Sequence, residues 1–192
     1  ACGSGAYLIG LLQEMARIHR TLSTYLGDSN GSEFNLKRQL ISKSLFGIDI
    51  DSNAVHRTKC RLWLSLATDS PKPFSVSRDE FNLETGDSLL GLGPQCVQDV
   101  LANDGGFDLV LANPPYVRHG HINPDFKKEL FRQYSRLEDS PVHNTTDLYC
   151  YFFVRANQFL RTNGIQIFIC SNSWLDAHFG TSLQQYLLRE TH

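Results

Sequence analysis

The sequence predicts an α/β fold with a mostly parallel sheet and helices on both of its faces. Short apolar, partly β-branched runs recur along the chain, and amphipathic segments with helical spacing separate them. Three of these runs lead into a polar residue where the expected strand ends, namely Asp49, Asp87 and Asn113. In open α/β sheets, ligands bind beyond the carboxyl ends of the strands, so these residues are the first candidates for a site.

The composition is that of an ordinary globular chain. With 192 residues, of which 41% are hydrophobic and 20% charged, we expect one domain spanning 1–192. A formal net charge of -2 argues against a histone-like binder of nucleic acid but leaves room for a local basic face. No apolar run approaches about 20 residues, so no membrane helix is expected. The five cysteines are widely spaced without a C-x-x-C pair, which favours reduced thiols in a cytosol, mostly as small core residues: Cys2, Cys60, Cys96, Cys150 and Cys170.

The first stretch, A-C-G-S-G-A, reads as a glycine loop that opens a helix. Apolar residues then continue at helical spacing as far as Leu22. Gly3 and Gly5 allow positive φ and close backbone approach, and a helix N-terminus offers free N–H groups. The G-K-[ST] of a phosphate loop and the third glycine of a dinucleotide fingerprint are both missing. Taken alone, the loop is therefore better explained as a simple tight turn, and the next element is needed to favour a binding role.

A connector at 27–32 and a short helix at 36–44 precede the next expected strand, 45–51. A helix at 53–67 follows, capped by Asp51 or Ser52, with an apolar set that we expect to be buried: Val55, Cys60, Leu62, Trp63, Leu64 and Leu66. A carboxylate at a strand tip, one βα unit after a glycine loop, is where nucleoside-binding α/β folds hold a ribose diol. Asp49 is the candidate, and a helix-capping role is the alternative.

A proline-containing loop at 70–78 leads to an expected strand at 81–85, which ends at Gly86-Asp87-Ser88. Asp87 places a second carboxylate at a strand end, where it could accept a hydrogen bond from an adenine amino group. Ordinary turn chemistry explains G-D-S equally well. The following segment, 90–106, is expected to be helix or loop.

The strand expected at 107–112 runs directly into Asn113-Pro114-Pro115-Tyr116. Two prolines cannot continue a sheet ladder, because they lack N–H donors and fix φ. The chain must therefore leave the sheet at Asn113 and present an amide, a bare carbonyl and an aromatic ring. Such groups suit a flat substrate that forms hydrogen bonds, whereas the alternative is a plain Pro-Pro turn.

The segment 117–146 lacks a clear core pattern apart from a short amphipathic helix around 126–134. Long loops after a catalytic strand often act as lids or binding elements, and its basic residues could contact phosphates. For any single lysine or arginine, a solvated helix face is the favoured explanation. His119 and His121 have no cysteine or carboxylate cluster nearby, so no metal site is expected. An apolar helix at 147–161, stopped by Gly164, a buried strand at 165–170 and a last helix at 181–189 complete the chain.

Taken together, these stretches resemble the catalytic domain of adenine-specific DNA methyltransferases, most closely the type IIG restriction–modification enzymes and related phage-defence enzymes. The resemblance rests on motifs in order along nearly the whole chain: A-C-G-S-G-A-Y-L, F-G-I-D-I-D, G-D-S-L, F-D-L-V-L-A-N-P-P-Y-V, D-L-Y-x-x-F and G-x-x-x-F-I-x-S-N-S-W-L. It implies a Rossmann-like S-adenosylmethionine-dependent methyltransferase fold.

The resemblance also implies roles for individual residues. Cys2, Gly3 and Gly5 would cradle the methionine part of S-adenosylmethionine, while Asp49 and Ile50 would hold the ribose. Asp87, Ser88 and Leu89 (or Leu90) would surround the adenine of the cofactor. Asn113 would lie beside the cofactor and, with the Pro114 carbonyl, accept hydrogen bonds from the target amino group. Pro115 completes the motif, and Tyr116 would stack on an adenine flipped out of double-stranded DNA.

The chain departs from the family pattern at both ends. We expect the first, central strand and the last two strands to be missing, together with the target recognition domain and any nuclease, so that this fragment alone would be inactive. A cytoplasmic protein of a bacterium or archaeon is implied. Two other functions stay open: methylation of a protein glutamine amide by the same motif, and a non-catalytic DNA-binding module with the same fold.

Overall fold

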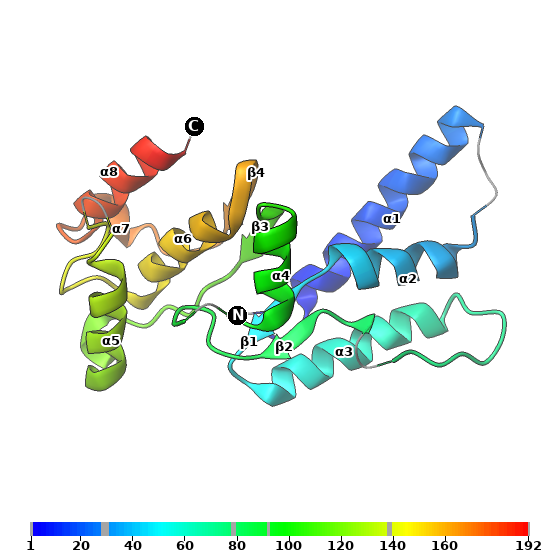
Figure 1. Ribbon diagram of the computed structural model, residues 1–192, viewed down its shortest axis with the longest axis horizontal. Coiled ribbons are helices and arrows are strands. Elements are labelled where there is room, and N and C mark those ends of the chain that lie inside the picture. Colours follow the sequence, from blue (N-terminus) through cyan, green and yellow to red (C-terminus); the bar gives the residue numbers. More distant parts are fainter. Residues whose placement is uncertain (1, 28–30, 78–79, 92, 138–139, 192) are drawn as a thin grey trace. The chain divides into compact units, whose positions relative to one another are not determined.

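The computed structural model describes residues 2–27, 31–77, 80–91, 93–137 and 140–191 (Figure 1). The chain divides into two compact units, Cys2–Gly86 and Asp87–His192, called here the amino-terminal and carboxy-terminal units. Part of the predicted connector, residues 28–30, and Arg78 of the predicted proline loop lie outside the described residues. Among the described residues, no helix combines the length and apolar character needed to cross a membrane.

The amino-terminal unit contains three helices and one pair of short parallel strands. Its elements in chain order are α1 (Ala6–Leu26), α2 (Glu33–Ser44), β1 (Gly47–Asp49), α3 (Ser52–Ala67) and β2 (Leu83–Thr85). Strand β1 pairs with β2 in the register Gly47↔Leu83 to Asp49↔Thr85. The strands are shorter than the apolar runs predicted, because Leu45 and Phe81 are buried in the core beside the strands rather than paired within them.

The core of this unit shows where helical spacing predicts burial well and where it fails. Val55, Leu62 and Leu66 of α3 are buried as predicted, and they lie on one helical face. The prediction was wrong for Cys60, Trp63 and Leu64, which lie on the neighbouring faces and are exposed. In α1 the buried face ends at Ala16, and Ile18 and Leu22 farther along are exposed.

The carboxy-terminal unit holds the other parallel pair. Its elements are α4 (Gln95–Asn103), β3 (Phe107–Ala112), the 3-10 helix η2 (His119–His121), α5 (Pro124–Tyr134), α6 (Leu148–Phe159), β4 (Leu160–Phe168), α7 (Ser173–Asp176) and α8 (Gly180–Glu190). Strands β3 and β4 are parallel and in register from Leu109↔Ile165 to Ala112↔Phe168. The parallel pairing predicted for the strands is thus confirmed within each pair. The predicted β3 and α5 agree with the observed elements.

Helices α5, α6 and α8 surround the core of this unit. Leu130 and Tyr134 of α5 and Val154 of α6 have no exposed surface, and Leu183 of α8 has almost none. The segment after Asn113-Tyr116 therefore contributes core residues of its own. Ring pairs add to this packing, including Tyr134 against Tyr151 with ring centroids 5.4 Å apart.

The boundary between α6 and β4 differs from the prediction. The helix was expected to run to 161 and to be stopped by Gly164, but it ends at Phe159, and β4 begins at once with Leu160. Gly164 serves close strand packing instead, because a Cβ there would lie 2.8 Å from the Phe107 carbonyl oxygen. Gly106 is similarly tight against the backbone of Leu160 and Arg161. Between the pairs Phe107↔Leu160 and Leu109↔Ile165, the register shifts, so residues 161–164 bulge opposite Asp108.

Strand β4 is not buried on both faces as predicted. Ile165, Ile167 and Ile169 alternate along the chain and are 58%, 52% and 57% exposed. The residues between them point to the opposite face, where Phe168 packs on Phe153 of α6 at 4.9 Å between ring centroids.

Candidate functional site

The glycine loop and the Asp49 carboxylate meet in the amino-terminal unit. The Gly3 N–H donates to Asp49 Oδ2 over 2.8 Å, and the Asp51 N–H donates to Asp49 Oδ1 over 3.0 Å. The Cys2 N–H donates to the Ile48 carbonyl, which anchors the loop to β1. Asp49 is buried, and two of its roughly four lone-pair positions are used by these contacts. The carboxylate therefore keeps acceptor capacity for a ligand. The residue that caps α3 is Asp51, whose side chain accepts from the Asn53 N–H, and not Asp49.

Gly5 is fixed by its surroundings. It is the left-handed N-cap of α1, with φ of 80°, and a Cβ there would lie 2.5 Å from the methyl carbon of Thr58. The Thr58 hydroxyl donates to the Gly3 carbonyl oxygen over 3.1 Å and to the Ala54 carbonyl oxygen over 3.0 Å. Gly3 also has positive φ, but a Cβ there would meet open space. The loop is therefore packed on α3 at Gly5 and accessible at Gly3. In addition, burial and the Asp49 carboxylate raise the pKa of the Cys2 thiol.

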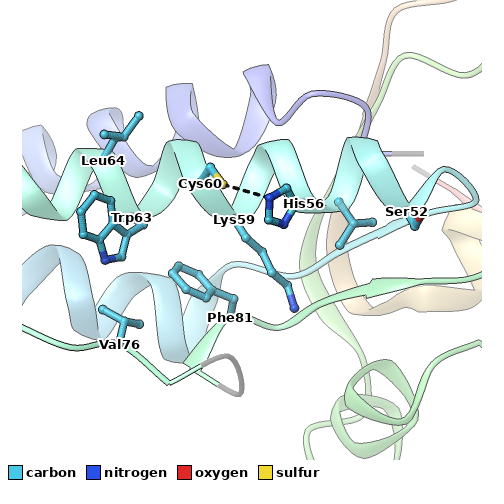
Figure 2. A pocket seen from close by; sticks show the side chains of 9 residues that line it. Ser52, His56, Lys59, Cys60, Trp63, Leu64, Val76 and Phe81 are labelled. Carbon is cyan, nitrogen blue, oxygen red and sulfur yellow. Dashed lines mark hydrogen bonds between the residues drawn. The ribbon is translucent and has the colours of Figure 1, made fainter.

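A groove runs along the exposed face of α3 (Figure 2). It has a volume of about 580 Å³ and is lined by Ser52, Val55, His56, Lys59, Cys60, Trp63, Leu64, Val76 and Phe81. The Cys60 sulfur lies 3.6 Å from His56 Nε2. This groove contains none of the site residues predicted from the sequence.

Asp87 begins a tight loop in the carboxy-terminal unit. Its Oδ1 accepts hydrogen bonds from the backbone N–H groups of Leu89 and Leu90, at 2.8 and 3.2 Å. Leu89 is only 2% exposed and packs in the core, whereas Leu90 is partly exposed. Of the two leucines, Leu90 is the one that keeps a surface for a ligand. Ser88, beside them, is held through its carbonyl oxygen by Arg155 Nε over 3.0 Å.

Asn113 and Tyr116 contact each other at the end of β3. The Tyr116 hydroxyl lies 2.7 Å from Asn113 Oδ1 and 3.1 Å from the Ile169 carbonyl oxygen, and it is the donor to both. Asn113, Pro115 and Tyr116 are exposed, while Pro114 is buried. The motif thus presents an amide and a ring to solvent from a rigid base. The Tyr116 hydroxyl therefore occupies Asn113 Oδ1, the oxygen that the sequence predicts as the acceptor for a substrate amino group.

Two buried residues from the start of α6 support this motif. Asp147 accepts from the His119 N–H through Oδ1 over 2.7 Å, and the Leu148 N–H donates to the Val117 carbonyl oxygen. The Tyr149 ring packs edge-on against Tyr116 at 6.4 Å between centroids, and its hydroxyl lies 2.8 Å from the Ser173 hydroxyl. Burial raises the pKa of Tyr149 to about 12. The D-L-Y stretch therefore holds the chain just after Tyr116, at Val117 and His119, and packs on the Tyr116 ring itself.

A family model, the Eco57I restriction-modification methylase, matches residues 43–192. The chain belongs to this family. Type II restriction enzyme and methyltransferase RM.Eco57I of Escherichia coli is 26% identical over 212 residues, an alignment that covers 97% of this chain and 21% of that protein. Type II methyltransferase M.BanIII of Aneurinibacillus aneurinilyticus is 29% identical over 143 residues, covering 74% of this chain and 22% of that protein.

A putative type II restriction enzyme and methyltransferase, RM.MjaORFECS2P of Methanocaldococcus jannaschii, is 35% identical over 97 residues, or 47% of this chain and 8% of that protein. The chain thus spans about a fifth or less of the length of these three relatives.

In this member of the Eco57I methylase family, the structure brings together three sets of predicted residues: Gly3 with Asp49, Asp87 with Leu89 and Leu90, and Asn113 with Tyr116. Ile50, 75% exposed beside Asp49, offers an apolar surface. No group of three or more potential metal ligands occurs within the described ranges, His119 and His121 included.

Sequence reasoning gave no role to Thr58 or Arg155, and it considered Asp147 only as one of two candidate caps, with Thr146, of the helix at 147–161. All three residues, Thr58, Asp147 and Arg155, are buried polar residues of this chain. A threonine or an arginine on an apolar helix gives no local sign of its partner, because each binds backbone far away in the sequence. The D-L-Y motif was the one available signal for Asp147.

Proposed function

We propose that the full-length protein transfers a methyl group from S-adenosylmethionine to the N6 amino group of adenine in double-stranded DNA, as a site-specific adenine methyltransferase of a restriction–modification or phage-defence system. The observation that carries this proposal is the end of β3, where Asn113 and Tyr116 project to solvent from the buried Pro114. Membership of the methylase family and the names of the relatives support it.

The residues present fit the cofactor. Gly3 leaves open space where a side chain would be, and Gly5 gives α1 a bare N-terminus, so the loop suits the methionine part. Asp49 has acceptor capacity for ribose hydroxyls, with Ile50 exposed beside it. Asp87 engages the backbone through Oδ1, which leaves Oδ2 for the adenine amino group, and Leu90 is available to pack on the ring. When bound, S-adenosylmethionine supplies an electrophilic methyl group on a sulfonium.

The chemistry follows from the acceptors at Asn113. An aromatic amino group is a poor nucleophile because its lone pair is delocalised into the ring. Asn113 Oδ1 and the Pro114 carbonyl oxygen would accept its two N–H groups and favour a pyramidal nitrogen with a localised lone pair. The contribution of the protein is then positioning and electrostatics, without a covalent enzyme intermediate.

Tyr116 would provide the stacking surface for the flipped base, whose extrusion costs a few kcal/mol. In the structure its hydroxyl donates to Asn113 Oδ1, the atom assigned to the substrate. Entry of the base therefore replaces one hydrogen bond on Asn113 by another and turns the Tyr116 ring to the base.

We extend the proposal to the fold and the setting of the protein. The parallel pairing within β1–β2 and within β3–β4 supports a Rossmann-like fold for the full-length protein, which would also carry a target recognition domain. Its place would be the bacterial or archaeal cytoplasm.

The test is a labelled-methyl transfer assay with the full-length protein and S-adenosylmethionine, offered duplex DNA and a protein extract in separate reactions. We expect label in DNA, recovered as N6-methyladenine after nuclease digestion. Label in protein glutamine instead would contradict the assigned substrate. If calorimetry detects no binding of S-adenosylmethionine to the full-length protein, the result would indicate a non-catalytic module.

A further inference from the structure

Side chains of two helices, α5 and α6, donate hydrogen bonds to backbone carbonyls of the loop that starts at Asp87. Arg155 of α6 donates from Nε to the Ser88 carbonyl oxygen over 3.0 Å and from Nη2 to the Gly91 carbonyl oxygen over 2.7 Å. Tyr134 of α5 donates to the Leu89 carbonyl oxygen over 2.7 Å. Three carbonyls of one short loop are thus tied to the core.

Gln133 of α5 adds to this arrangement. Its Nε2 donates to the Leu89 carbonyl oxygen over 3.0 Å, and its Oε1 accepts from the Gly91 N–H over 3.3 Å. With Arg155 and Tyr134 it forms the loop clamp, a name used below for these three residues. All clamp residues and the loop belong to the carboxy-terminal unit.

Burying the Arg155 guanidinium costs desolvation free energy. Only 9% of it is exposed, and a buried guanidinium is tolerated only where its charge and donors are satisfied. The two loop carbonyls, the Gln158 side chain at 3.1 Å and the Phe159 ring at 4.4 Å supply that compensation. Burial lowers the pKa of Arg155, and the nearby Tyr134 and Asp87 oppose this effect. The packing therefore favours one loop conformation over others that would leave the cation unpaired.

Tyr134 and its neighbour Tyr151 give an internal comparison. Both rings are fully buried and pack on each other, but the Tyr151 hydroxyl has no hydrogen-bond partner in the described part of the chain. The Tyr134 hydroxyl donates a hydrogen bond to the loop, and the Tyr151 hydroxyl does not. The pair offers two matched substitutions of buried phenols, of which only Tyr134→Phe removes a hydrogen bond to the loop.

We propose that Arg155 and Tyr134, assisted by Gln133, are positioning residues that hold the Asp87–Leu90 backbone in the conformation that receives the adenine of S-adenosylmethionine. With its carbonyls held inward, the loop keeps the Leu89 and Leu90 N–H groups on Asp87 Oδ1, and this fixes the direction of the free Oδ2. The proposal rests on the proposed function of this loop. It adds that α5 and α6 help to set cofactor affinity.

The experiment compares Tyr134→Phe with the matched control Tyr151→Phe in the full-length protein. Calorimetry measures the Kd for S-adenosylmethionine, and hydrogen exchange of the cofactor-free protein measures protection of the Leu89 and Leu90 amides. For Tyr134→Phe we expect a Kd raised about three- to ten-fold and faster exchange at both amides, from the loss of one buried hydrogen bond. Tyr151→Phe should leave both measurements at their wild-type values.

Two arginine substitutions extend the test. Arg155→Met should raise the Kd more than Tyr134→Phe does, and Arg155→Lys should fall between wild type and Arg155→Met, because a lysine keeps the charge and can reach one of the two carbonyls. At saturating cofactor, kcat for DNA should stay within about two-fold of wild type in Tyr134→Phe. The proposal is overturned if wild type binds the cofactor and Tyr134→Phe binds it equally well, or if kcat falls while Kd is unchanged. Wild type that binds no cofactor would instead contradict the proposed function.

Discussion

Asn113 offers one side-chain carbonyl oxygen at the end of β3, and Tyr116 already donates a hydrogen bond to it. This single contact separates the roles of the two residues. In the proposed chemistry the Asn113 oxygen would be the acceptor for the substrate, the Tyr116 hydroxyl would compete with the substrate for that oxygen, and only the Tyr116 ring would contact the base.

At this residue, Asn113→Ala in the full-length protein should lower kcat for DNA by at least about a hundred-fold, since an acceptor aimed at the reacting nitrogen is lost. The Kd for S-adenosylmethionine, measured by calorimetry, should change little. Methyl transfer at the wild-type rate would remove Asn113 from the mechanism.

At Tyr116, the two truncations should differ. Tyr116→Phe keeps the stacking surface and frees Asn113 Oδ1, so binding of duplex DNA should be as tight as in wild type or tighter. Tyr116→Ala removes the ring and should weaken base capture by about 1–3 kcal/mol. Fluorescence of 2-aminopurine at the target position reports the flipped base in both variants. Equal loss in the two variants would mean that the hydroxyl, and not the ring, holds the substrate.

Sequence reasoning placed Asn113 and Asp49 at strand ends because the apolar runs before them are easily seen, and in the structure β1 ends at Asp49 and β3 ends just before Asn113. It missed the contact between Tyr116 and Asn113, since a side-chain rotamer depends on packing against Tyr149, 33 positions along the chain. It also named Leu89 as a residue that contacts the cofactor, but the Leu89 side chain is buried in the hydrophobic core.

Among the elements, α1 shows how a glycine ties a loop to a neighbouring helix. Gly5 is both the N-cap of α1 and the contact point for Thr58 of α3. The Thr58 hydroxyl in turn holds the Gly3 carbonyl, so the loop conformation and the helix packing depend on each other.

Gly5→Ala should therefore destabilise the protein by about 1–3 kcal/mol, because a Cβ forces Thr58 to move and alanine is strained at positive φ. The affinity for S-adenosylmethionine should fall with it. Gly10→Ala is the control in the same helix: its Cβ would meet nothing, and it should stabilise the helix by about 0.5–1 kcal/mol. Urea unfolding and calorimetry measure both variants. A harmless Gly5→Ala would show that the loop does not need its left-handed turn.

Most of the longer helices were predictable from spacing, and their buried faces only partly so. The segment that contains α4 was left open as helix or loop, and α7 was not predicted. Leu62 and Trp63 are adjacent and both apolar, yet one is buried and the other lines an exposed groove. The α6–β4 boundary failed for a related reason. Gly164 looked like a helix stop, but its lack of a side chain serves close strand packing against Phe107.

For the molecule as a whole, the buried phenols and thiol of the carboxy-terminal unit predict sensitivity to alkali. Burial raises the pKa of Cys150 from 9.0 and that of Tyr151 from 10.0, each to about 12. Above pH 9 the unfolded chain loses protons that the folded chain retains. The stabilising effect is therefore complete below pH 9 and is lost as pH rises toward 12, with a slope of about 1.4 kcal/mol per pH unit for each titrating group.

Tyr151→Phe removes one of these groups without removing a hydrogen bond within the described residues. Urea unfolding of the intact protein at pH 8 and pH 11 should show a smaller loss of stability in Tyr151→Phe than in wild type. The expected difference is about 1 kcal/mol, because the phenol titrates over only part of that range. Parallel pH profiles of the two proteins would contradict the assignment.

The paired glycines at the start of β3 and β4 have a consequence for insertions and deletions. Close packing at Gly106 and Gly164 fixes the register of the two strands at their start. Side chains then alternate between the two faces along β3, so the number of residues between Gly106 and Asn113 decides which face Asn113 is on. One residue inserted within Phe107–Ala112 would turn the Asn113 side chain to the opposite face of the sheet. Within the bulge, Thr162 and Asn163 are exposed and have no partner in the β3–β4 register, so an insertion between them should be absorbed. Length variation among active homologues should accordingly collect in that bulge and be excluded from β3.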